Sequence, residues 1–77
     1  MNASEMIKYI IKKSWKSQRD VADLIGMNKK TLDNKFYRDN FEANDLLKIS
    51  DILGLKIVFI DKETEKVIFD TSSVTPD

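Results

Sequence analysis

Apolar side chains recur at helical spacing in four segments of the first 54 residues, with charged side chains between them. The segments are NASEMIKYIIKKSW, the stretch from Gln18 to Ile25, the stretch from Asn28 to Tyr37, and ANDLLKISDILG. Each segment has the length and the apolar stripe of a short amphipathic helix. The pattern therefore predicts four helices, one after another.

Polar residues and glycines mark where these helices begin and end. Asn2, with a glutamate three residues later, fits a capping box, and Ser17 and Asn28 are N-caps whose side-chain oxygens accept free amides of the first turn. Gly26 and Gly54 close the second and fourth helices because glycine tolerates the left-handed conformation that a helix end often requires.

After Gly54 the apolar period changes from about 3.6 to 2. The runs LKIVFID and EKVIFD are short, β-branched and aromatic, and the polar loop KETE joins them, which predicts a hairpin. The loop has no glycine, so its left-handed position falls on Glu65. The expected fold is mainly α, with a four-helix bundle over residues 1–54, a C-terminal two-stranded antiparallel β-hairpin over 55–71 as part of the same domain, and a flexible tail over 72–77.

The expected hairpin is apolar on both faces. In its first strand Ile57 and Phe59 point one way, and Val58 and Ile60 point the other. In its second strand Val67 and Phe69 share a face, and Ile68 lies on the opposite one. A hairpin with one face in water would alternate apolar with polar residues, so this one needs a cover. The hypothesis is a symmetric homodimer whose interface consists of Val58, Ile60, Ile68 and Phe69. A C-terminal tail folded over the hairpin is the alternative.

Composition narrows the chemistry available to the 77 residues. The chain has no cysteine and no histidine, which excludes disulfides, thiolate or imidazole zinc sites and histidine-based catalysis. We therefore expect no enzyme, no catalytic residue, no metal, no cofactor and no small-molecule ligand; a carboxylate-based hydrolase is the remote alternative. No apolar run approaches the ~20 residues of a membrane helix, and no signal-peptide pattern is present, so a cytoplasmic protein without a membrane partner is expected.

The zero net charge hides a gradient. Residues 1–38 carry nine Lys/Arg and four carboxylates, a net charge of +5, and residues 39–77 carry four lysines and nine carboxylates, a net charge of −5. Such a division can offer a basic face to a polyanion. Chance, or pairing between the two halves, is the other explanation.

The second and third expected helices form a tight corner. Ala22 is small enough for a close approach of the two helix backbones, Gly26 lets the chain reverse, and Ile25, Met27 and Leu32 fill the corner. The outward positions of the third helix are then free to enter a major groove, where side chains that form hydrogen bonds read base edges. The candidate base-contacting residues are Lys29, Lys30, Asp33 and Asn34, and an ordinary solvated helix face is the alternative.

The segment SQRDVADLIGMNKKTL resembles the helix-turn-helix of the phage repressor and Cro family, the XRE-type regulators. The resemblance is carried by Ser17, Gln18, Ala22, Gly26, Met27, Asn28 and Leu32. It implies a lambda-repressor-like fold and a transcriptional regulator, a phage-like or mobile-element repressor, that binds double-stranded DNA at a palindromic operator as a homodimer. The residues that it assigns to the DNA backbone are Gln18, Asn28, Lys35, Arg38 and Asn40.

Two positions depart from the family pattern. Lys35 stands where the family usually has an apolar residue, and Lys16 replaces the apolar residue before the cap, for which Trp15 is expected to supply packing. Tyr9 and Tyr37 are expected to be half-buried with packed rings, and stacking on a sugar or base is the alternative. The rival function is a protein-interaction module with the same fold, such as an antitoxin or anti-repressor, which the zero net charge favours.

Overall fold

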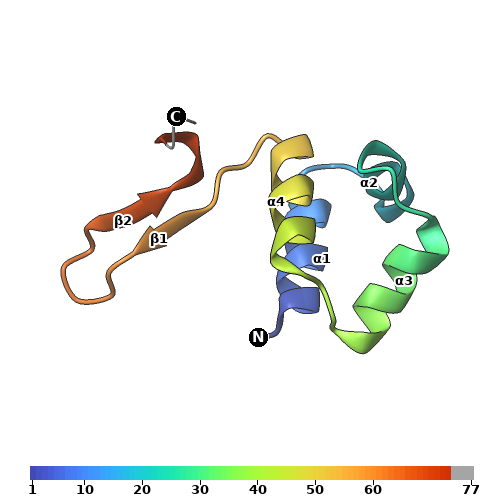
Figure 1. Cartoon of the computed structure of the whole chain (residues 1–77), viewed down its shortest axis with the longest axis horizontal. Coiled ribbons are helices and arrows are strands. Elements are labelled where there is room, and N and C mark those ends of the chain that lie inside the picture. Colours follow the sequence, from blue (N-terminus) through green and yellow to red (C-terminus); the bar gives the residue numbers. More distant parts are fainter. Residues whose placement is uncertain (74–77) are drawn as a thin grey trace.

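Four helices and then a two-stranded hairpin make up the chain (Figure 1). The computed structural model describes residues 1–73. Its helices are α1 (Ala3–Lys13), α2 (Gln18–Leu24), α3 (Lys29–Arg38) and α4 (Ala43–Ile52), and its strands are β1 (Val58–Ile60) and β2 (Val67–Asp70). The mainly helical class with an antiparallel hairpin, as expected from the sequence, is confirmed.

The N-caps form where the sequence predicts them, but the capping box expected at Asn2 is half formed, because the Glu5 side chain returns no hydrogen bond to Asn2 within residues 1–73. The Asn2 side chain accepts a hydrogen bond from the Glu5 amide at 2.9 Å, which satisfies a free N–H of α1. Ser17 and Asp20 cap α2 reciprocally, each side chain accepting the other residue's amide. The Asn28 side chain accepts the Lys30 amide at 2.8 Å and opens α3.

Left-handed residues end the helices. Gly26 and Gly54 have φ of 71° and 72°, as their positions predict. Asp39, with φ of 50°, ends α3, and its carboxylate accepts a hydrogen bond from the Ser4 amide at 2.9 Å. The Ser4 hydroxyl donates in turn to the Phe36 carbonyl at 3.1 Å, so the end of α3 is tied to the start of α1.

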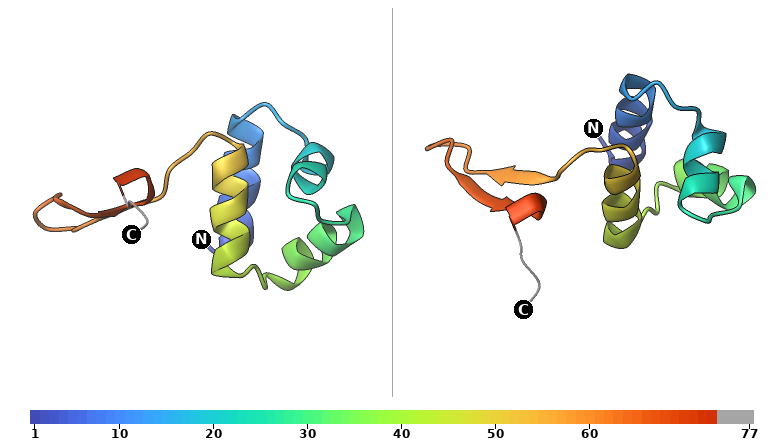
Figure 2. Two further views of the ribbon diagram at one scale, coloured as in Figure 1. Left: turned by 45° about the horizontal axis from the view of Figure 1, so that its top comes forward. Right: turned by 90° about the horizontal axis from the view of Figure 1, so that it is seen from above.

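The core lies among the helices. In Figure 2, α1 and α4 lie side by side in the middle of the molecule, with α2 and α3 on one side and the hairpin on the other. Phe41, just before α4, packs edge-to-face on Phe36 with ring centroids 4.9 Å apart. All four helices contribute to the buried apolar cluster, which consists of Ile7, Ile11, Val21, Ala22, Leu32, Phe36 and Ile49.

The hairpin has an irregular register. Phe59 pairs with Phe69, but Ile60 pairs with Val67, so Ile68 is an extra residue in β2 and forms a β-bulge. Residues that pair directly across the strands share a face. Val67 therefore lies on the face of Ile60, and the sequence-based placement of Val67 beside Phe69 was wrong. The left-handed turn residue is Glu65, with φ of 61°, as predicted.

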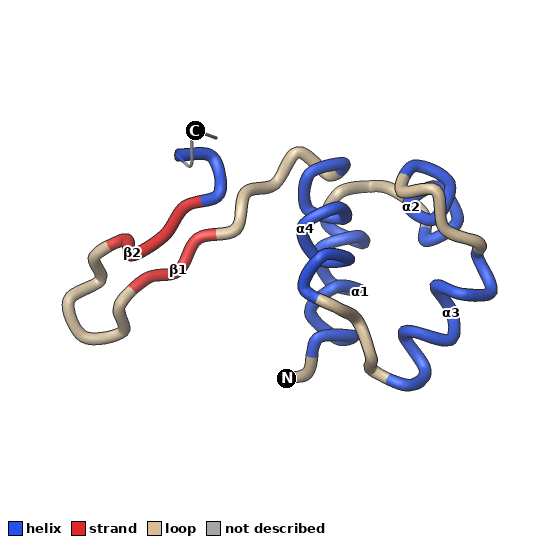
Figure 3. Tube along the Cα trace, viewed as in Figure 1, coloured by secondary structure: helices blue, strands red, loops and turns tan. Residues whose placement is uncertain are grey.

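Residues 55–73, called the arm below, project from the helices (Figure 3). The two strands contact mainly each other. Thr71–Ser73 form a 3-10 turn at the start of the expected tail, whose remaining residues, 74–77, lie outside the described part of the chain. Within the described residues, the helices are too short or too polar to cross a membrane.

Candidate nucleic-acid interface

The corner between α2 and α3 is closely packed. Ala22 and Leu32 are fully buried, and the Met27 amide donates to the Ala22 carbonyl at 2.8 Å across the turn. Gly26 supplies the left-handed residue of this turn, and Ile25 and Met27 pack against the core from the corner. The corner residues take the places that the sequence predicts, and among residues 1–73 no ion pair joins α2 to α3, so apolar packing holds the corner together.

One side of α3 faces solvent. Leu32 and Phe36 are buried beneath the helix, whereas Lys30 and Asn34 are exposed on it. Tyr37, seven residues after Lys30, is 90% exposed, so the expectation that its ring would be half-buried was wrong. Residues at this spacing lie on one side of a helix. The exposed row, called the α3 stripe below, consists of Lys30, Asp33, Asn34 and Tyr37.

Two of the four predicted base-contacting residues pair with each other. The Lys29 ammonium forms an ion pair with the Asp33 carboxylate one turn along α3. Lys29 is half-buried, and Lys30 forms no ion pair within residues 1–73. The paired charges of Lys29 and Asp33 largely cancel at the helix surface. Lys30 and Asn34 are therefore the polar side chains of the predicted set that are available to a ligand.

Lys35 faces α4 rather than the solvent. Its Nζ lies 2.9 Å from Asp45 Oδ2, and the two side chains are only 19% and 12% exposed. Burial alone would raise the pKa of Asp45, but hydrogen bonds from the Glu42 amide and from Lys35, with the nearby positive charges, lower it below 3.8. The structure does not support Lys35 as a DNA-backbone contact; this lysine joins α3 to α4, which explains how a charged residue occupies an inward position.

Of the other four predicted backbone-contacting residues, three lie at the ends of α3 and one lies at the start of α2. Gln18 is half-buried at the first position of α2, and Asn28 is exposed but uses its side-chain oxygen to cap α3. Arg38 and Asn40 are exposed at the far end of α3. Asn28 thus lies at the start of α3 and Arg38 and Asn40 at its end, where polar groups could contact the two sides of a groove.

Two aromatic residues lie outside the core, contrary to expectation. Trp15 is 97% exposed and has φ of 62°, so it does not replace the missing apolar packing at Lys16. Tyr9 is 58% exposed, with the Lys13 ammonium 5.4 Å from the centre of its ring. The sequence pattern did not indicate the exposure of Trp15 because an aromatic residue beside a cap more often packs there.

α3 and the arm lie at opposite ends of the molecule. The helices α1–α3 fall within the segment of net charge +5, and Figures 1 and 2 place α3 away from the arm, with α1 and α4 between them. The arm carries three lysines and four carboxylates over residues 55–73. A polyanion would therefore be attracted to the helical end rather than to the arm.

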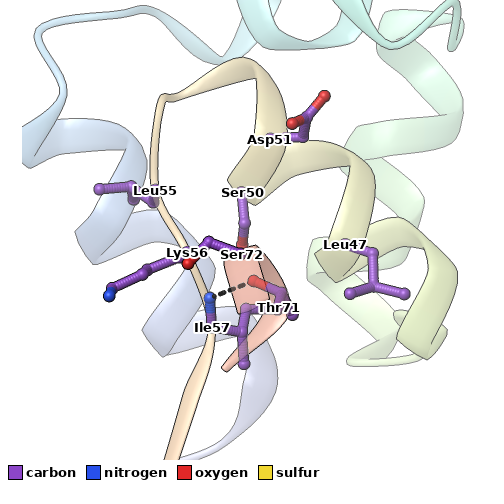
Figure 4. Close-up of a pocket in the computed structure, with 8 residues that line it drawn as sticks. All are labelled: Leu47, Ser50, Asp51, Leu55, Lys56, Ile57, Thr71 and Ser72. Atoms are coloured by element: carbon purple, nitrogen blue, oxygen red, sulfur yellow. Dashed lines mark hydrogen bonds between the residues drawn. The ribbon is translucent and has the colours of Figure 1, made fainter. Parts of the chain in front are cut away.

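Three hollows among the described residues lie around the junction of α4 and the arm, and one of them is also lined by Met6 and Ile10 of α1. One of about 300 Å³ (Figure 4) is open to solvent, and at its edge the Thr71 hydroxyl accepts the Ile57 amide at 3.0 Å. Beside it, a hydrogen bond from Lys56 and further bonds from Ser72 lower the pKa of Asp70 to about 2. Within residues 1–73, no three carboxylates, histidines or cysteines gather as metal ligands would. The residues that line this hollow are Leu47, Ser50, Asp51, Leu55, Lys56, Ile57, Thr71 and Ser72.

Comparison of the chain with protein-family models, with curated proteins and with solved structures finds no match. The function is therefore inferred from the residues of this chain, chiefly from the α3 stripe and the arm.

Proposed function

We propose that the chain is a sequence-specific DNA-binding transcription regulator whose α2 and α3 form a helix-turn-helix, and that it acts as a homodimer on a palindromic operator. The observation that carries the proposal is the α3 stripe. Lys30 and Asn34 are exposed on α3, the helix that follows the Gly26 turn. Leu32 and Phe36 pack the opposite side of this helix into the core. A helix presented in this way fits a major groove.

The stripe has the chemistry to read bases. The Lys30 ammonium can donate to the acceptors of guanine, and the Asn34 amide can both donate to and accept from the edge of adenine. Tyr37, at the far end of the stripe, offers an apolar ring to a thymine methyl group. The ion pair of Lys29 with Asp33 fixes the first turn of α3 beside these residues. Base specificity would then depend on three exposed side chains, each with different chemistry.

Affinity would come from contacts with the phosphate backbone. Asn28 lies at one end of the stripe and Arg38 and Asn40 at the other, while Gln18 begins α2; the segment that holds α1–α3 carries most of the chain's positive charge. Phosphate contacts position a protein on DNA and make binding fall with salt. Repression by occupying an operator needs no catalytic group.

The proposal is tested by adding a short duplex to ¹⁵N-labelled protein and following the amide signals. The amides of α3 and of the first turn of α2 should shift, more weakly as salt is added, while those of the arm should not. A response confined to the arm, or none at low salt, would contradict the proposal.

Single substitutions then test whether particular side chains of the α3 stripe contact the bases, as distinct from a general effect of positive charge. Lys30→Ala and Asn34→Ala should each weaken binding to an operator by roughly tenfold or more, since a good base contact contributes about 1–3 kcal/mol. Lys62→Ala, which removes an exposed lysine from the arm, is the matched control and should leave the affinity unchanged. Thermal stability should change little in all three because the side chains are exposed.

One observation favours a second candidate function. The arm exposes apolar side chains, as a module that binds another protein would. An antitoxin or anti-repressor of this fold would bind its partner through the arm and show no salt-sensitive response of α3 to DNA. The same titration, with purification of the protein from its host and a search for a stoichiometric partner, distinguishes the two functions.

A further inference from the structure

The arm exposes apolar side chains on both of its faces. Phe59 is 61% exposed, Ile60 on the opposite face is 55% exposed, and Ile68 at the bulge is 70% exposed. A two-stranded hairpin is only marginally stable in water without other packing. The arm therefore needs apolar packing on both faces, which the helices of its own chain do not supply.

A groove separates the arm from α4. Its walls are Phe59 and Phe69 on one side and Leu46 and Leu47 on the other, and it holds about 310 Å³ of space. The two Phe rings lie against each other, with centroids 6.1 Å apart, so the wall formed by the arm is aromatic. A hollow of this size would hold about ten waters against an apolar lining, which is unfavourable. We call it the α4–arm groove; Ala43, Ile57 and Thr71 complete its lining.

The uncovered apolar area has the size of a stable protein interface. At about 200 Å² for each large side chain when fully exposed, the residues of the arm and of α4 leave roughly 750 Å² uncovered. A stable complex buries about 800 Å² on each partner. The residues counted, each between 42% and 70% exposed, are Leu47, Leu55, Phe59, Ile60, Val67, Ile68 and Phe69.

The charge of the arm indicates what covers it. With three lysines and four carboxylates, the arm has no net attraction for a nucleic acid or an anionic lipid surface. Two copies of a nearly neutral arm do not repel each other. The outer face of the arm, with Val58, Ile60 and Val67, is apolar except for Asp70, which pairs with Val58 at the end of the strands and forms an ion pair with Lys56. The groove is lined mainly by apolar side chains, so a second copy covers both surfaces in a single two-fold interface.

We propose that each arm lies in the α4–arm groove of a second copy, in a reciprocal exchange. The outer face of one arm, with Val58, Ile60 and Val67, packs on Leu46 and Leu47 of the other copy. The inner faces, with their Phe pairs, then pack on each other, so both faces of the hairpin are buried. This requires the groove to widen, by rotation of the arm about residues 54–56.

The exchange specifies how the two copies of the proposed homodimer contact each other, and it rests on that proposed function. It differs from an interface made by the hairpins alone. It places Phe69 against the other arm and Ile60 against α4, whereas the sequence-based set placed Val58, Ile60, Ile68 and Phe69 together. It also makes α4 part of the interface. A substitution on α4 therefore tests the exchange without altering the arm.

The first experiment measures the mass of the free protein by sedimentation equilibrium, without DNA. The wild type should be a dimer, and Leu47→Glu, on α4, should raise the dimer Kd by at least tenfold. Leu24→Glu, on α2, is the matched control, because Leu24 is 56% exposed and Leu47 46% exposed, and it should remain a dimer. A monomeric wild type, or a Leu47→Glu variant that dimerises like the control, would overturn the proposal.

The second experiment uses the absence of cysteine from the chain. Leu47→Cys protein is mixed with differently tagged Ile60→Cys protein, allowed to exchange subunits and then oxidised. A disulfide between the two kinds of chain is the expected product, and Leu24→Cys in place of Leu47→Cys should give none. Equal cross-linking in both mixtures, or none in the first, would overturn the exchange. Because neither experiment contains DNA, their failure is separate from failure of the α3 titration.

Discussion

The ion pair between Lys35 and Asp45 is expected to hold α3 in place against α4. It joins two helices across 2.9 Å, in a position where both side chains are mostly buried. Lys35→Met keeps the length of the side chain and removes the charge. Asp45→Asn keeps an oxygen that can accept the Glu42 amide, so the cap of α4 survives. The two variants and their combination form a double-mutant cycle.

The expected coupling free energy between Lys35 and Asp45 lies between two limits. Exposed ion pairs contribute about 0–1 kcal/mol, and breaking a fully buried pair costs about 3–5 kcal/mol. Because this pair is partly buried and Asp45 keeps its amide partner, we expect about 1–2 kcal/mol of coupling at neutral pH. For a domain of this size, Lys35→Met should then lower the Tm by about 5–15 °C. Lys62→Met, which removes an exposed arm lysine, is the control and should have little effect.

The pH dependence follows from the lowered pKa of Asp45. A carboxyl whose pKa is lower in the folded chain than its ordinary 3.8 stabilises the fold fully above 3.8, and the contribution is lost as the pH falls through the folded value. Urea unfolding, followed by circular dichroism, gives the coupling at neutral pH and at a pH low enough to protonate Asp45 in the folded chain. A coupling near zero at neutral pH, or one that persists once Asp45 is protonated, would show that the ion pair does not stabilise the fold.

Three further substitutions test the helical part of the fold by thermal and urea unfolding. Trp15→Gly should raise the free energy of unfolding by about 0.5–1 kcal/mol, because Trp15 is left-handed and exposed where helix ends favour glycine; a loss would show that the ring packs. Ser17→Ala should cost about 1 kcal/mol by removing the cap of α2, and no loss would show that the capping box is unimportant. Ala22→Leu should cost about 1–3 kcal/mol or more by overpacking the buried corner, and a neutral result would contradict the close approach of α2 and α3.

Features governed by local chemistry were predictable from the sequence. The capping of α2 by Ser17 depends on a residue only three positions away, and the turn residues Gly26 and Glu65 follow from the backbone conformation that a short connection requires. The change of apolar period at Gly54 separates the helices from the hairpin. These signals were sufficient for the order and type of the elements.

Features that depend on distant residues were not predictable in this way. The Lys35 side chain points inward because Asp45 meets it from α4, and nothing near Lys35 in the sequence indicates this pairing. The bulge at Ile68 depends on how β1 aligns with β2, so alternation within one strand gave the wrong face for Val67. Tyr37 extends the α3 stripe, but its exposure depends on which side of α3 the other helices cover.

If the α3 stripe reads a DNA sequence, selection from a random pool of duplexes will reveal it. The purified protein is used at two salt concentrations, and the retained DNA is sequenced. We expect an enriched inverted repeat, with half-sites one helical turn or a multiple apart, that is retained at the higher salt while other DNA is lost. Salt-sensitive retention of DNA with no enriched sequence would contradict this expectation.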